Sequence, residues 1–347
     1  MLTMPEFLIN LIIIFSKIGF VLTVLLTGVA YSVYAERRVS AFIQNRYGPN
    51  RVGPQGLLQP LVDVVKLLMK EDIVPEKANK FIHSLAPTIS IIVSLSTIAV
   101  IPFGDTITIG DRVIKLQIAD VNVGVLYFLA MTSLCVYGIT LSGWSSNSKY
   151  SLLGGLRSSA QMISYELSMG LAVIAIILMN GSLELDTIVQ SQAGWKWNII
   201  LQPLGFIIFL TSAFAETNRA PFDLPEAEQE LVGGYHTEYS SMKFALFFLA
   251  EYANVIVSSA MITTLYLGGW QVPYLQDIGL PPMATSIIQV LAFGLKVVLL
   301  VLFFIWVRWT VPRFRYDQLM NMGWKIMLPF GILNLVVTAI VILFLKR

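Results

Sequence analysis

Long apolar stretches separated by charged connections constrain this 347-residue chain more than any other feature. A helix that crosses a bilayer needs about 20 mainly apolar residues. Eight stretches meet that requirement, at about 6–34, 83–103, 121–143, 159–180, 199–215, 244–267, 285–307 and 324–345. The sequence therefore predicts an all-α integral membrane protein with eight transmembrane helices, forming a single polytopic membrane domain over residues 1–347.

The composition agrees with a surface that faces lipid. Charged residues make up 13% of the chain and hydrophobic residues 56%, whereas a soluble domain carries about 25% charged residues. This argues against a soluble enzyme, a disordered protein or a collagen. A membrane β-barrel is also disfavoured, because barrel strands alternate in ~10-residue units and these apolar runs are continuous and longer.

The distribution of basic residues predicts an orientation. The odd-numbered connections between the predicted spans hold fifteen lysines and arginines, and the even-numbered connections hold three. By the positive-inside rule, the odd connections lie in the cytoplasm or matrix and both termini lie on the opposite side. The first stretch lacks a basic leader and a small-residue cleavage site, so we expect a retained, tilted helix.

Cysteine and histidine are too scarce for most metal centres. The chain has one cysteine, Cys135, and two histidines, His83 and His236, which are far apart in sequence. Zinc and iron–sulfur sites normally need several thiolates or imidazoles. We therefore expect no redox centre bound by this chain itself.

The first inside connection combines turn residues with positive charge. Gly-Pro steps recur within residues 44–56, beside Arg46 and Arg51. Because proline fixes φ and glycine permits positive φ, these steps indicate a stiff loop. The loop either rests on anionic lipid headgroups or has a more specific role.

Residues 57–70 follow with the pattern of a surface helix. Gln59, Asp63, Lys66 and Lys70 form one polar stripe, and leucine, valine and methionine cover the other side. A helix of this length is too short to span and should lie in the interface. It either anchors the chain or frames an opening for a lipid-soluble molecule.

The third inside connection is acidic, against the bias of the other inside connections. Six carboxylates occur there with one arginine, Arg219: Glu216, Asp223, Glu226, Glu228, Glu230 and Glu238. Crowded carboxylates raise one another's pKa values, so some can exchange protons near neutral pH. The alternatives are proton handling, docking of a partner and an ordinary solvated loop.

Charges inside the predicted spans are few. Glu166, Glu251 and Lys296 each lie within an apolar run, where a central charge costs at least ~2.5–3.5 kcal/mol on insertion scales. Such groups serve either a path or partner, or an internal ion pair that locks the helices together.

Several of these segments occur together in one known family. They are Ala35–Arg38, Arg46–Asn50 continuing to Pro60, Trp144–Tyr150, Ala215–Asp223 and Pro312–Met320. With these motifs in this order, essentially the whole chain resembles the family of H-type, quinone-chamber membrane subunits of proton-pumping NADH–quinone oxidoreductase, respiratory complex I.

The resemblance implies a role at the quinone chamber. In that family the subunit forms most of the chamber's entrance and lower wall, beneath the peripheral subunits that carry the terminal iron–sulfur cluster, and partner subunits hold the flavin and the iron–sulfur clusters. The implied entrance residues are Glu36, Arg37, Arg46, Asp63, Lys66, Arg308, Arg313 and Asp317. The implied proton-transfer residues are Glu166, Glu216, Asp223, Glu226, Glu228, Glu230 and Glu251.

The same resemblance implies quinone as substrate, with no cofactor bound by this chain. Its partners would be the peripheral quinone-site and iron–sulfur subunits, small membrane subunits and antiporter-like subunits, with membrane lipids around them and no nucleic acid. The expected location is an energy-conserving membrane, such as a bacterial inner membrane. Two alternatives are the equivalent subunit of a membrane-bound nickel–iron hydrogenase-type complex and a free-standing secondary transporter, although no convincing internal repeat occurs.

Overall fold

The computed structural model describes residues 4–109, 112–224, 231–275 and 279–345. The longer helices are α1 (Met4–Ile43), α3 (Lys80–Thr97), α4 (Gly124–Ser145), α5 (Lys149–Asn180), α8 (Pro203–Glu216), α10 (Ser241–Tyr266), α11 (Pro282–Thr310) and α13 (Leu328–Leu345). Shorter helices are α2 (Gln59–Leu68), α6 (Leu185–Ser191), α7 (Asn198–Leu201) and α12 (Tyr316–Asn321). Single turns are η1 (Pro54–Gly56), η2 (Ile98–Val100) and η3 (Gly234–His236), and η5 (Met322–Met327) is a π-helix that joins α12 to α13.

The structure confirms the predicted class, an all-α integral membrane protein. Within the described residues, seven helices are long and apolar enough to cross a membrane. The fifth predicted span, 199–215, falls on α7 and on α8, which is apolar but has 14 residues. At 1.5 Å per residue α8 is about 21 Å long, short of a ~30 Å hydrocarbon core. The count of eight spans therefore stays a prediction.

Two predicted boundaries differ from the observed ones. α1 continues from the predicted end near residue 34 to Ile43, so Glu36 and Arg37 lie on the helix. No proline or glycine interrupts the chain from there until Gly48, and Ser40 and Ala41 are buried, which lets the helix continue. The surface helix predicted at 57–70 is present as α2, Gln59–Leu68.

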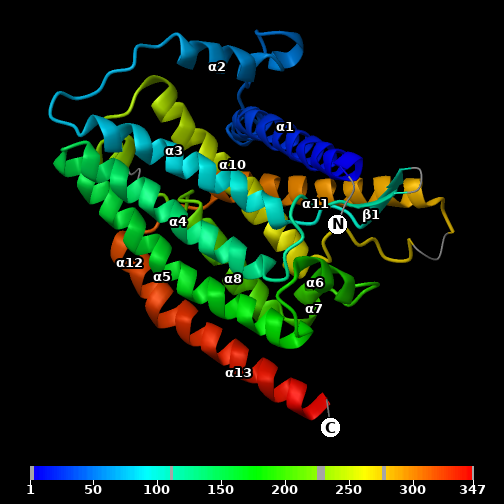
Figure 1. Cartoon of the computed structure of the whole chain (residues 1–347). Helices are drawn as coiled ribbons and strands as arrows, with labels where there is room; N and C mark the ends of the chain where they lie inside the picture. Colours follow the sequence, from blue (N-terminus) through cyan, green and yellow to red (C-terminus); the bar gives the residue numbers. More distant parts are fainter. Residues whose placement is uncertain (1–3, 110–111, 225–230, 276–278, 346–347) are drawn as a thin grey trace.

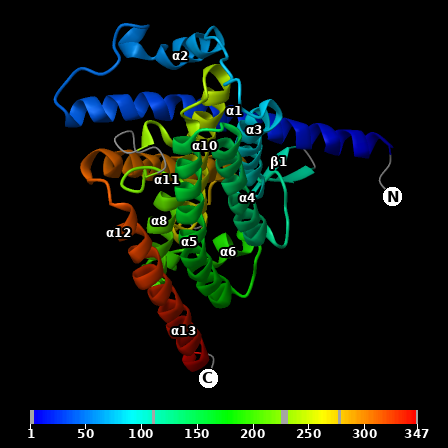
Figure 2. The ribbon, with the colours of Figure 1, turned by 90° about the vertical axis from the view of Figure 1, so that its left-hand side faces the viewer.

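The helices form a bundle that two long helices cross. α3, α4 and α5 lie side by side, and α10 packs behind α3 (Figure 1). α1 and α11 both contact α10, and α1 runs across the direction of α4 and α5 (Figure 2). α13 packs along α5 and α8. α2 lies beyond α1 on the same side of the bundle as the N-terminal end of α10, and contacts both helices (Figures 1 and 2).

A small β-hairpin joins α3 to α4. Strands β1 (Thr106–Ile109) and β2 (Arg112–Lys115) pair antiparallel, with Thr106 opposite Lys115. Ser286 near the start of α11 donates to the carbonyl of Thr106 over 2.6 Å, so the hairpin is tied to α11.

Small residues allow neighbouring helices to approach one another closely. A Cβ at Gly138 of α4 would collide with Ser90 Oγ of α3, and one at Gly154 of α5 would lie 2.7 Å from Gly234 Cα of η3. Membrane helices associate mainly through such close packing, because lipid tails are as apolar as leucine. The close approach of η3 to α5 helps to place Tyr235, which reaches the candidate site described below.

Lys296, in the middle of α11, has a structural role. Its ammonium donates to the carbonyls of Leu267, Gly269 and Gln271 over 2.8, 2.9 and 2.8 Å, and lies 4.7 Å from the ring centre of Trp197. These carbonyls follow the C-terminus of α10, where a positive charge is favourable. Of the two interpretations of this charge, the geometry favours an internal tie between α10 and α11.

Candidate functional site: a buried network of charged side chains

Glu36 joins three helices at one end of the site. It is 7% exposed on α1. It accepts a hydrogen bond from the Tyr252 hydroxyl of α10 over 2.6 Å, and its other oxygen lies 2.5 Å from Arg308 of α11. A buried carboxylate needs this kind of pairing, because an unpaired charge in an apolar interior is strongly destabilising.

A small cavity adjoins this junction. It has a volume of about 20 Å³ and is lined by Ser32, Glu36, Arg219, Tyr252, Val255, Val301, Phe304, Ile305 and Arg308. This space fits roughly one water molecule. The polar groups of Glu36 and Arg219 thus share one small volume with apolar side chains of α10 and α11.

Arg219 connects this junction to a second carboxylate. Its guanidinium stacks on the Tyr252 ring, 4.2 Å from the centroid, and lies 2.9 Å from Glu251. The hydroxyl of Tyr235 donates to the other oxygen of Glu251 over 2.7 Å. Glu36 and Glu251 are therefore linked through one tyrosine and one arginine.

Buried polar residues of α5 position the segment that carries Arg219. Gln161 is fully buried, and its amide donates to the carbonyls of Ala215 and Phe222 over 2.8 and 2.9 Å. Asn218 accepts from Ser158 over 3.2 Å. The Pro-Phe-Asp part of the motif also packs inward, since Phe222 is 3% exposed. The segment before residue 225 is therefore a packed element and not a solvated loop.

The buried carboxyl of Asp223 contacts the exposed Arg313. Asp223 Oδ2 lies 3.0 Å from Arg313, and the side chain of Asp223 is 9% exposed. Burial raises the pKa of Asp223 to about 6, although the Arg313 guanidinium acts in the opposite direction. Glu251 and Arg308 are also within electrostatic reach of Asp223, which places it in the same network.

Glu166 and Glu216 form the far part of the network. Glu166 of α5 accepts from the Ser133 hydroxyl of α4. Glu216 at the end of α8 lies next to Thr132, whose hydroxyl donates to the Leu129 carbonyl. The two carboxyls interact electrostatically with each other. Among the described residues, Glu216 Oε2 is buried without a hydrogen-bond partner.

Cys135 of α4 lies near both parts of the network. It is within electrostatic reach of both Glu216 and Glu251, and it accepts a hydrogen bond from the Asn254 amide over 3.4 Å. The network thus extends from Glu36 to Glu166. Its side chains come from α1, α10, α4, α8 and α5 and from the segment after α8.

The remaining predicted entrance residues lie outside this network. Arg37 of α1 pairs with Asp63 of α2 over 2.7 Å. Arg46 is exposed and bonds its neighbour Gln44 over 2.7 Å, and Lys66 is exposed. Asp317 pairs locally with Arg315 over 2.5 Å. The predicted proton-transfer residues Glu226, Glu228 and Glu230 lie outside the described residues.

Three residues of the network were absent from the predicted site. Arg219 stood in the acidic motif without an assigned role, whereas Tyr235 and Tyr252 gave no charge signal. Tyr252 could have been found from its place directly after Glu251, because a buried tyrosine hydroxyl usually has a polar partner.

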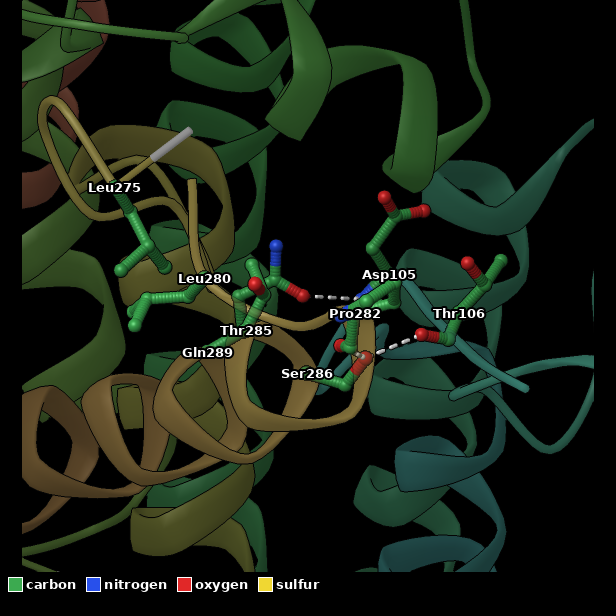
Figure 3. Close-up of a pocket in the computed structure, with 8 residues that line it drawn as sticks. All are labelled: Asp105, Thr106, Leu275, Leu280, Pro282, Thr285, Ser286 and Gln289. Carbon is green, nitrogen blue, oxygen red and sulfur yellow. Dashed lines mark hydrogen bonds between the residues drawn. The ribbon is translucent and has the colours of Figure 1, made fainter. Parts of the chain in front are cut away.

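A second cavity lies far from these residues along α11. It has a volume of about 260 Å³ and lies between β1 and the start of α11, lined by Asp105, Thr106, Leu275, Leu280, Pro282, Thr285, Ser286 and Gln289 (Figure 3). The Gln289 amide accepts from the Asp105 backbone N–H over 3.3 Å. None of the predicted site residues lines this cavity, so it is separate from the network.

Possible metal ligands do not gather in the described part of the chain. No group of three or more histidine, cysteine, aspartate or glutamate side chains there has an arrangement that could hold a metal ion. The ring of His83 instead stacks on Tyr239, with centroids 3.9 Å apart.

Comparison with known proteins decides the family. The family model described as NADH dehydrogenase matches residues 16–339. The chain belongs to this NADH dehydrogenase family. Similar curated proteins include an H-type subunit of NADH-quinone oxidoreductase of Cytophaga hutchinsonii, 52% identical over 97% of this chain and 98% of its own length. Others are NADH-quinone oxidoreductase subunit 8 of Rhodothermus marinus, 57% identical over 89% and 91%, and the H-type subunit of Salinibacter ruber, 53% identical over 93% and 94%.

These matches confirm the predicted resemblance over nearly the full length of this family member. Its long apolar helices make it a multi-pass membrane protein. The residues assigned to the quinone entrance and to proton transfer remain predictions, because the matches identify the family and not the role of each side chain.

Proposed function

We propose that this chain is a membrane subunit of NADH–quinone oxidoreductase, as its relatives' names suggest, and that it forms part of the quinone chamber and couples quinone reduction to proton translocation. The observation that carries the proposal is the buried series of charged contacts from Glu36 to Glu251. Buried ionisable groups in a membrane protein are costly and usually serve a path or a partner.

The entrance lies where α1, α2 and α10 meet. The Arg37–Asp63 pair holds α2 to α1, and the Ser241 hydroxyl of α10 donates to the Leu67 carbonyl of α2 over 3.1 Å. The apolar side chains of α2 are exposed in the isolated chain, with Leu61 64% exposed. A lipid-soluble quinone can pass along such a surface, with Glu36 and Arg308 behind it as polar partners.

A change of charge near Glu36 is transmitted through shared contacts. Tyr252 bonds Glu36 and stacks on Arg219, and Arg219 pairs with Glu251. Removing negative charge from Glu36 weakens its hold on Tyr252 and Arg308, which alters the field at Glu251 and Asp223. Carboxyl groups further along, Glu216 and Glu166, can then exchange a proton.

The chain depends on other subunits for electrons. We assign flavin and iron–sulfur clusters to peripheral partner subunits. We place antiporter-like subunits beyond Glu166, as the subunits to which the proton transfer is coupled. The odd-numbered connections face the cytoplasm, in keeping with their fifteen basic residues. The membrane is a bacterial inner membrane, as the bacterial sources of the relatives suggest.

A Glu216→Gln variant tests the proton role directly. The amide has nearly the shape of the carboxyl group but cannot ionise or carry its proton. We expect the complex to assemble, with proton pumping lost or reduced by roughly 100-fold, as for loss of a general acid–base group. Pumping and NADH–quinone turnover are measured together in reconstituted vesicles.

Glu76→Gln is the matched control, because Glu76 is an exposed carboxylate in the connection before α3. It should leave both activities unchanged. Normal pumping in the Glu216→Gln complex would overturn the proton role of this network.

A further inference from the structure

One turn of α4 places hydroxyl groups among the carboxyls. Thr132 lies next to Glu216 of α8, and Ser133 bonds Glu166 of α5. These two residues are consecutive in a helix that is otherwise mainly apolar. The same turn carries Cys135, so three polar side chains of α4 face the network within four residues.

Each hydroxyl also has a second acceptor within its own helix. Thr132 Oγ1 and Ser133 Oγ both lie 2.9 Å from the carbonyl oxygen of Leu129. A hydroxyl has one proton to donate and two lone pairs to accept with, and a carbonyl oxygen can accept two hydrogen bonds. Each hydroxyl can therefore donate its one proton either to the Leu129 carbonyl or to a carboxyl group.

The two orientations of the hydroxyl correspond to the two protonation states of a carboxyl group. An ionised carboxylate can only accept, so the hydroxyl donates to it. A protonated carboxyl can donate, so the hydroxyl turns its proton to the Leu129 carbonyl and accepts from the acid. Rotation about one C–O bond suffices, and the hydroxyl keeps a hydrogen bond in both states. Leaving a buried hydroxyl unpaired would cost more than the bond itself is worth.

We propose that Thr132 and Ser133 are positioning residues for proton transfer, which let Glu216 and Glu166 gain and lose a proton in place by switching their hydroxyl groups between the carboxyl and the Leu129 carbonyl. This inference rests on the proposed proton path. In one transfer, a carboxyl O–H bond breaks at one glutamate and forms at the other. Each hydroxyl keeps its own proton, and no electron moves.

The ionisable groups around this turn come from every neighbouring helix of the network. They are Glu166 of α5, Glu216 of α8, Glu251 of α10 and Cys135 of α4 itself. Glu166 and Glu216 repel each other when both are ionised. One shared proton relieves that repulsion, and the two hydroxyls allow it to reside on either carboxyl.

The test uses Thr132→Val, Ser133→Ala and the double variant in the assembled complex. Valine has nearly the shape of threonine but lacks the hydroxyl. We expect proton pumping to fall roughly ten-fold in each single variant, which is the size expected for one hydrogen bond to a charged group. Thr132→Ser keeps the hydroxyl and should pump protons at the wild-type rate.

Thr140→Val is the matched control. Thr140 lies on the same helix and is half-buried, and its hydroxyl donates to the Val136 carbonyl over 2.8 Å. It should leave pumping unchanged. Infrared difference spectra recorded on quinone reduction give a second measurement: the carboxyl band that Glu216→Gln removes should shift in Thr132→Val and stay in place in Thr140→Val.

The outcomes separate this inference from the proposed function. A Glu216→Gln defect together with normal pumping and an unshifted carboxyl band in Thr132→Val would overturn the hydroxyl role and leave the proton path standing. An equal defect in Thr132→Val and Thr140→Val would also overturn it, since the effect would then be one of helix packing. No defect in Glu216→Gln would remove the proton path itself.

Discussion

At the residue scale, the buried charges are satisfied by shared partners. Glu36 is held by Tyr252 and Arg308, and Glu251 by Arg219 and Tyr235. Replacing a buried ion pair by apolar residues is often neutral or stabilising, whereas removing one partner costs about 3–5 kcal/mol. The network is therefore better explained by the proposed proton transfer than by a stabilising role, because apolar packing would stabilise the fold more simply.

Asp223 gives a prediction on pH. Its pKa in the folded protein, about 6, lies above the ordinary value of 3.8 because the carboxyl is buried. The folded protein therefore holds this proton more tightly than the unfolded chain does. The resulting stabilisation is fully present below about pH 3.8 and is lost as pH rises through about 6.

The Asp223→Asn variant removes that titration. Thermal unfolding of wild type and variant, measured from about pH 4 to pH 8, should show a smaller loss of stability with rising pH in the variant. The difference should be on the order of 2 kcal/mol, given the separation between the folded and unfolded pKa values. Parallel curves for the two proteins would contradict the buried, titrating carboxyl.

At the element scale, the long first helix and the surface helix act as one unit. α1 reaches Ile43 and so carries Arg37 to the level of α2, where it meets Asp63. Gln59 also donates to Asp63 over 2.9 Å. The side chains of Arg37 and Asp63 are 47% and 29% exposed, so solvent screens the pair. An exposed pair of this kind contributes at most about 1 kcal/mol.

Breaking this tether should change quinone access and leave the chemistry intact. Arg37→Ala and Asp63→Ala should each raise the apparent KM for quinone by at most about five-fold, the equivalent of about 1 kcal/mol, with kcat little changed. The double variant should be no worse than either single one, because the pair is already broken. Additive effects in the double variant would mean that the two residues act separately, and a large fall in kcat would place them in the chemistry.

At the scale of the whole molecule, the network lies where helices from distant parts of the sequence cross. α1 and α11 meet α10 at the junction of Glu36, Tyr252 and Arg308 (Figures 1 and 2). The other end, at Glu166 and Glu216, is formed by α4, α5 and α8. The proposed path across the bundle thus needs all of these helices in place.

The orientation of the whole chain can be measured with single cysteines. Cys135 is the one native cysteine and is buried, so the background reaction is low. Lys77→Cys, in the first inside connection, should react with an impermeant thiol reagent from the cytoplasmic side. Lys196→Cys should react from the opposite side, since both lysines are exposed and lie in connections of opposite parity. Reaction of both from one side would contradict the positive-inside assignment.

The membrane class, the approximate positions of the long helices, the surface helix and the carboxyl-rich segment could all be predicted from the sequence. These properties depend on apolar length and on local spacing, which a linear pattern records directly. It was less informative at helix ends and in short elements. α1 continued to Ile43, and α8 proved only 14 residues long, because burial against neighbours and turn geometry decide where such helices stop.

Which charged side chains contact one another could not be predicted from the sequence and became visible in the folded structure. Glu36 and Arg308 are 272 positions apart, and Glu36 and Tyr252 are 216 apart, yet both contacts are direct. It also showed that Lys296 ties α10 to α11 and that Thr132 and Ser133 face carboxyl groups. The physical reason is that hydrogen bonds and ion pairs depend on distance in space. Helix crossings set that distance, and the local sequence does not specify how helices cross.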